Sequence, residues 1–246
     1  TVAVPRNRRG VLLAVIAVLH AATNATSGHT LFGAVAFALA YAVEAVVIVA
    51  VYERLMAGVD RSFTTVRSVL VFSLAAIGIP AVTGSLGALA STIAYGPVDI
   101  VEAWFIWSVT DSLGLMIFAP LVVVWSDIRP AEVSAIGWRR HAVAALSFTL
   151  FTVLLEFLVG THLPVRLPVF SRAYLTFPLL FLWTYKYGVK GVTVAMLPIT
   201  GVMLWNSMDG SWSQIWPSAS FPRVVTVQLF LVVLSVSGLA FAALLK

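Results

Sequence analysis

Four carboxylic acids interrupt apolar segments of this sequence: Glu44, Glu102, Asp111 and Glu156. Glu44 and Asp111 lie near the middles of their segments, whereas Glu102 and Glu156 lie close enough to segment ends to reach water. If lipid surrounds these segments, a central carboxyl is kept only where it is paired, protonated or facing a polar cavity. Glu44 and Asp111 therefore have two interpretations. They form a ligand or ion site, or they are protonated groups that join neighbouring helices by hydrogen bonds.

A stripe of chemically useful side chains surrounds Asp111. Trp104, Trp107, Asp111 and Gly114 are spaced three, four and three residues apart, which places them on one face of a helix. A carboxyl flanked by two indole rings and a glycine gap could bind a polar or cationic ligand. The same stripe is typical of an aromatic packing seam, with Trp104 as an anchor at the membrane surface. We take Glu44, Trp104, Trp107 and Asp111 as the candidate ligand-binding residues or buried polar centre.

Other chemistries find less support in the residue pattern. His20 could bind a metal with Glu44 or Asp111, but no spacing requires it, so no metal site is predicted. Thr83–Gly87 could present a serine nucleophile, but no histidine base falls on a later core helix. Its glycines suit close helix packing equally well. With no cysteine, phosphate loop or nucleotide fingerprint, no catalytic residue is predicted and any cofactor is unknown.

The composition indicates that lipid is the solvent for most of the chain. Of the 246 residues, 61% are hydrophobic and 10% are charged, and the mean hydropathy is +1.01. A soluble domain would carry about a quarter charged residues. We expect an all-α, polytopic transmembrane bundle of about eight helices forming one domain over residues 1–246. The predicted helices are 11–26, 31–52, 66–94, 102–125, 143–158, 171–187, 189–205 and 224–245.

The third predicted helix is longer than a membrane requires. Its 29 residues would extend ~43 Å, and Pro80 lies inside it, so a kink or a break is expected there. We take five residues as structural or hinge positions: Pro80, Gly84, Gly114, Pro120 and Pro178.

The basic residues predict the orientation. With eight helices and a cytoplasmic N-terminus, three of the 15 lysines and arginines lie outside, namely Arg166, Arg172 and Arg223, and the other twelve lie inside. Both termini are then cytoplasmic, and the net charge of +5 reflects this sorting rather than nucleic-acid binding.

Two stretches resemble a known family. One runs from Ala103 through Trp107 and Asp111 to Leu121, and the other is Tyr174–Leu180 followed by Trp183, Gly188 and Gly191, with Gln228-Leu229 beyond. They are similar to the membrane-associated sensor domain of the first class, a bacterial integral membrane input module. Tyr41–Ala45 fits that family's glutamate-bearing helix, although Tyr41 stands where the family usually has asparagine. The family pattern highlights these residues: Glu44, Trp107, Asp111, Gly114, Pro120, Phe177, Pro178, Gly188 and Gly191.

The resemblance implies a sensor in the bacterial plasma membrane rather than an enzyme. Family members usually carry a cytoplasmic diguanylate cyclase, phosphodiesterase or histidine kinase, so the chain is expected to be a fragment whose last helix continues past Lys246. The family usually begins with further apolar sequence before the first predicted helix, and this sequence lacks it. The expected partners are lipid, an unknown small molecule or membrane protein, and an output domain in cis; a homodimer is allowed, and nucleic acid is not expected. A secondary transporter or channel-like protein with carboxylates at mid-membrane is the main alternative.

Overall fold

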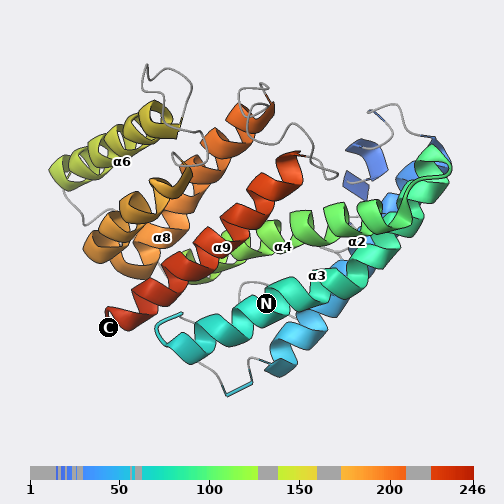
Figure 1. Ribbon diagram of the computed structural model, residues 1–246. Helices are drawn as coiled ribbons and strands as arrows, with labels where there is room; N and C mark the ends of the chain where they lie inside the picture. Colours follow the sequence, from blue (N-terminus) through green and yellow to red (C-terminus); the bar gives the residue numbers. More distant parts are fainter. Residues whose placement is uncertain are drawn as a thin grey trace. The chain divides into compact units, whose positions relative to one another are not determined.

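The fold is helical throughout the part of the chain that the structure describes. A computed structural model describes residues 30–55, 57–58, 63–126, 138–159, 173–208 and 223–246, with scattered positions between 15 and 26. Six helices with defined bounds lie in these ranges, no strand does, and six segments are long and apolar enough to cross a membrane. The expected all-α, multi-pass class is therefore confirmed (Figure 1).

The chain divides into two compact units, the first comprising Thr1–Asp60 and Leu70–Leu115. This unit contains α2 (Leu31–Leu55), most of α3 (Val66–Tyr95) and the first part of α4 (Ile100–Trp125). The start of α2 meets the end of α3, since a Cβ added to Gly33 would lie 2.8 Å from the Ala94 Cβ. The two helices are therefore antiparallel and approach closely where their side chains are smallest.

Polar side chains define where these helices begin. The Thr30 hydroxyl accepts from the Gly33 amide of α2 at 3.1 Å. At α3, Thr65 and Ser68 exchange side-chain-to-backbone hydrogen bonds of 3.2 and 3.4 Å, which is a reciprocal cap. Asp99 Oδ1 accepts from two amides of the first turn of α4, at 2.9 and 3.0 Å. The cap explains why α4 begins at Ile100, two residues before the predicted start.

Helix α3 is not broken at Pro80, because it continues as one helix from Val66 to Tyr95. The sequence predicted a kink or a break at Pro80, and the break does not occur. Proline removes one backbone donor and crowds the preceding turn, but neighbouring groups inside a helical membrane protein can compensate for both effects. The apolar residues on either side of Pro80 favour helix equally, so the sequence continues in the same conformation.

The second unit comprises Arg61–Val69 and Met116–Lys246. Its helices are the end of α4, α6 (Trp138–Val159), α8 (Thr176–Met208) and α9 (Arg223–Leu244). Both α6 and α9 pack against α8. Gly238 of α9 makes the closest fit, since a Cβ there would lie 2.8 Å from Leu180 and 3.1 Å from Val192. Because these two residues lie on different halves of α8, both halves contact α9.

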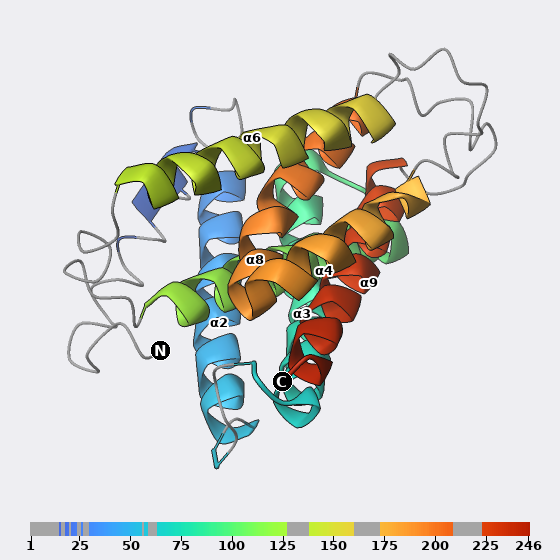
Figure 2. The same ribbon diagram turned by 90° about the vertical axis from the view of Figure 1, so that its left-hand side faces the viewer.

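Helix α8 consists of two helical arms that meet at Gly188, where φ is 61° and ψ is −149°. Only glycine adopts this backbone conformation readily. Figure 2 shows the two arms as a V. The predicted boundary between helices 171–187 and 189–205 is therefore confirmed at Gly188.

The starts of α6 and α8 each differ by five residues from the prediction, and several predicted features fall outside the described ranges. Helix α6 begins at Trp138, five residues before the predicted start, so part of the expected polar connection is helical. Tryptophan and arginine extend their polar tips to the membrane surface, which lets a helix continue beyond its apolar run. Most of the predicted helix 11–26, with His20, lies outside the described residues, as do Arg166 and Arg172.

Candidate functional site

Glu44 and Asp111 come together in the first unit from two different helices. Glu44 is the fourteenth of the 25 residues of α2, and Asp111 is the twelfth of the 26 residues of α4. Their carboxyl groups lie within hydrogen-bonding reach of each other, and Glu44 also reaches the Thr83 hydroxyl of α3. Only 7% of Glu44 is exposed. Three helices therefore converge on one buried polar centre.

A hydrogen bond between two carboxyl groups requires a proton on one of them, because carboxylates only accept. The Thr83 hydroxyl donates to the Ile79 carbonyl at 3.1 Å, so its lone pairs remain available to a proton on Glu44. One oxygen of each acid, Glu44 Oε1 and Asp111 Oδ2, is buried and makes no hydrogen bond. A shared proton or a bound cation would meet this unsatisfied demand, and an apolar environment makes leaving it unmet costly.

Aromatic rings connect this polar centre to one end of the unit. Tyr41, one helical turn before Glu44, interacts electrostatically with both Glu44 and Asp111. Its ring lies 5.2 Å from the Trp107 ring, edge to face. Phe37, a further turn back along α2, stacks on Trp107 with centroids 5.5 Å apart. Trp107 thus lies against two consecutive turns of α2.

Trp107 is held in place by a hydrogen bond and by a missing side chain. Its indole N–H donates to the Ser91 hydroxyl at 2.9 Å, and that hydroxyl donates to the Gly87 carbonyl at 2.9 Å. A Cβ on Gly87 would overlap the indole, at 2.4 Å from Cδ2. The ring therefore occupies space that only glycine leaves open.

The other members of the predicted stripe have different surroundings. The Trp104 indole donates to the Ala81 carbonyl at 2.8 Å, so this residue joins α4 to α3. Gly84 lets α4 approach, since its Cβ would overlap the Ser108 hydroxyl. A Cβ on Gly114 would meet no atom within 4 Å, so Gly114 provides no close contact within the described residues. The structure therefore brings Glu44 and Asp111 together, and Tyr41 connects this pair to Trp107. Trp104 contacts α3 instead.

The alternative chemistries gain no geometric support in the described residues. No group of three or more histidines, aspartates or glutamates there could hold a metal ion. The Ser85 hydroxyl is exposed and donates to the Val82 carbonyl of its own helix, 2.7 Å away. Glu156 lies in the second unit, where the Asn206 amide is 3.5 Å from one of its oxygens.

The hinge and family positions of the second unit have mainly packing contacts. Pro178 lies in the first turn of α8, where a missing N–H has no helical partner to lose. Phe177 packs edge to face on Phe230, with centroids 5.6 Å apart. A Cβ on Gly191 would lie 2.7 Å from the Tyr187 Cβ, which the bend at Gly188 brings close. Pro120 lies inside α4, which continues through it.

Sequence reasoning missed four residues of the cluster: Phe37, Tyr41, Thr83 and Ser91. A signal existed for Tyr41 and Phe37, which lie three and seven residues before Glu44 and so share its helix face. Thr83 and Ser91 lie on a different helix, and their partners depend on how α3 is rotated against its neighbours. No local pattern specifies that rotation.

These observations define a multi-pass helical membrane protein with a carboxyl pair buried inside one of its units. The sequence profile of MASE1, a membrane-associated sensor domain, matches residues 2–246, and the chain belongs to this family. The resemblance stated from the sequence is therefore confirmed. MASE1 is a non-catalytic membrane sensor module. No curated protein and no solved structure matched the chain.

Proposed function

We propose that the chain is the sensory and transducing part of a bacterial signalling protein in the plasma membrane. It crosses the membrane about eight times with both termini in the cytoplasm, and its last helix leads to an output domain such as a diguanylate cyclase or histidine kinase. Membership of MASE1 and the sorting of basic residues support this function. The whole chain acts as one domain, because a single family match spans both compact units.

The observation that carries the proposal is the contact of Glu44 with Asp111 and Thr83. Each of these residues comes from a different helix, so the arrangement of three helices determines how well the carboxyl pair is satisfied. A ligand or ion that binds one arrangement more tightly shifts the population toward it. The change in packing then passes along the helices to the output domain.

Substitutions that keep the shape of the centre test this function. A diguanylate cyclase fused after Lys246 would report the state of the module as cellular cyclic di-GMP. Asp111→Asn and Glu44→Gln remove one acid each, so we expect a changed output level or a lost response. Ser237→Ala is the control, because that exposed hydroxyl only bonds the Val233 carbonyl of its own helix. Normal folding with unchanged output in both variants would leave Glu44 and Asp111 a structural role only.

The transporter alternative makes a different demand on the same residues. Carboxyls near mid-membrane also occur in secondary transporters. Solute flux into proteoliposomes that is lost in Asp111→Asn would favour transport. Output changes without flux would favour sensing.

A further inference from the structure

A hollow of about 460 Å³ opens in the first unit where α3 ends and α4 begins. Three aromatic residues line it, each from a different helix: Phe37 of α2, Tyr95 of α3 and Trp107 of α4. Two carboxylates, Asp99 and Glu102, line it as well. The volume falls in the range of small-molecule sites, which combine mainly apolar walls with a few polar groups.

The aromatic walls are pre-arranged rather than loosely placed. Phe37 is 3% exposed and lies 5.5 Å from the Trp107 ring and 6.0 Å from the Tyr95 ring, measured between centroids. The Ser91 hydroxyl, itself a lining group, fixes the Trp107 indole by accepting its N–H. A ligand would therefore meet fixed rings at Phe37 and Trp107, with Tyr95, which is 60% exposed, beside them. Rigid contacts lose little entropy on binding.

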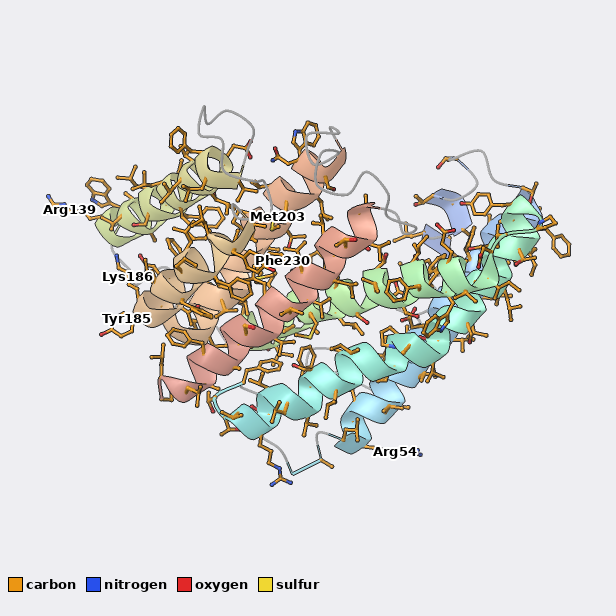
Figure 3. The ribbon with its side chains drawn as sticks, viewed as in Figure 1. Arg54, Arg139, Tyr185, Lys186, Met203 and Phe230 are labelled. Atoms are coloured by element: carbon orange, nitrogen blue, oxygen red, sulfur yellow. The ribbon has the colours of Figure 1, made fainter. Side chains whose placement is uncertain are left out.

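The charge at the hollow has one sign. Asp99 and Glu102 both line it, and among the described residues that line it there is no lysine or arginine. Arg54 lies in the last turn of α2, whereas Phe37 lies near the start of that helix. Figure 3 labels Arg54 at this end of α2. Asp99 uses Oδ1 to cap α4, while Oδ2 takes no part in that cap. Within the part of the chain that the structure describes, the carboxylates thus face a hollow that no lysine or arginine side chain lines.

We infer that this hollow binds a small organic ammonium ion. Aromatic ring faces attract cations through their quadrupoles, and quaternary ammonium groups are recognised by aromatic walls of this kind. The two carboxylates add charge complementarity and disfavour anions. In the proposed topology the hollow opens to the outside of the cell, and its ligand is the stimulus of the sensor. The role of the ligand as stimulus rests on the proposed function, whereas the binding of an ammonium ion does not depend on it.

The hollow is connected to the buried carboxyl pair by side-chain contacts, through which a bound cation can affect the packing of the helices. Trp107 forms a wall of the hollow and contacts Tyr41 at 5.2 Å. Tyr41 in turn interacts electrostatically with Glu44 and Asp111. A cation bound against the Trp107 ring is therefore two contacts away from the polar centre, and its charge acts on that centre over this short path.

Binding can be measured on the purified chain in lipid nanodiscs by titration calorimetry. Choline is the probe, and 3,3-dimethylbutan-1-ol is its uncharged isostere. We expect choline to bind and the isostere to bind at least about tenfold more weakly, since only the charge differs. Glu102→Gln and Tyr95→Leu should each weaken choline binding about tenfold or more. Glu53→Gln, the same change at the far end of α2, should leave it unaltered.

Three results would overturn the inference. The first is no choline binding up to about 10 mM, beyond the range of useful small-ligand affinities. The second is equal binding of the isostere, which would make the hollow merely apolar. The third is a loss of binding in Glu53→Gln as large as that in Glu102→Gln, which would indicate a general charge effect. If choline does not bind but Asp111→Asn still changes the cyclic di-GMP output, only the ligand class is rejected. If choline binds but the output never changes, the sensory role is rejected.

Discussion

Substituting Gly87 by alanine tests whether the tight fit of Trp107 organises the first unit. The added Cβ would lie 2.4, 2.6 and 2.8 Å from three atoms of the indole. The ring cannot move aside freely, because it stacks on Phe37 and touches Tyr41. Overpacking of this kind costs about 1–3 kcal/mol. Displacing the ring also breaks its hydrogen bond to Ser91, at about 0.5–1.5 kcal/mol.

The two effects together predict a loss of about 2–4 kcal/mol in the free energy of unfolding. For a chain of this size the midpoint of thermal unfolding should fall by roughly 5–15 °C. Gly78→Ala is a matched control on the same helix, since a Cβ there meets no atom within 4 Å. Alanine favours helix over glycine by up to about 1 kcal/mol, so this variant should be unchanged or slightly more stable.

The assay is thermal unfolding of the purified protein in one detergent, followed by circular dichroism, for Gly87→Ala, Gly78→Ala, Trp107→Ala and the Gly87/Trp107 double variant. If the clash is the cause, removing the indole should abolish most of the penalty at Gly87, a coupling of at least about 1 kcal/mol. The reasoning is refuted if Gly87→Ala is tolerated as well as Gly78→Ala. It also fails if the penalty persists in the Trp107→Ala background.

Three further predictions have defined outcomes. Gly188→Ala should lower the unfolding free energy by about 1–3 kcal/mol because φ is positive there. Gly201→Ala is the control and should not lower it, since a Cβ at Gly201 has open space around it. Equal midpoints of thermal unfolding for the two variants would contradict this prediction. Asn206→Leu should cost about 1–3 kcal/mol because it removes the amide beside Glu156, a loss that thermal unfolding would detect. Asp99→Ala should cost about 1 kcal/mol as a lost cap, whereas Asp99→Asn should retain stability and weaken only choline binding in the same calorimetric assay.

The helices could be predicted from the sequence because each is a long apolar run bounded by polar or turn residues. The boundary at Gly188 followed from such punctuation, and the conformation found there requires glycine. At Pro80 the same kind of local signal predicted a kink or a break, and α3 continues through this residue without a break. Local signals therefore placed the elements well, except where tertiary contacts could compensate for an unfavourable residue.

The candidate site was only half predictable. Glu44 and Asp111 stood out because carboxyls are rare in apolar segments, and the structure brings them together. Their neighbours Thr83 and Ser91 did not stand out, because hydroxyls are tolerated anywhere in a membrane helix. Since these helices are apolar around their whole circumference, no amphipathic face indicates which side packs against which neighbour. The functional role of the predicted site residues stays a prediction.

The backbone break at Gly188 also sets a depth within the bilayer. A helix end leaves several amide and carbonyl groups without intrahelical partners, and hydrocarbon offers them none. The eight-helix topology proposed above places the junction of the two arms at a membrane surface, where water or lipid headgroups can satisfy these groups. Lys186 and Lys190, both exposed, flank it and would sit at that level with their ammonium groups among the phosphates. A spin label beside this glycine would thus report the plane of one membrane surface.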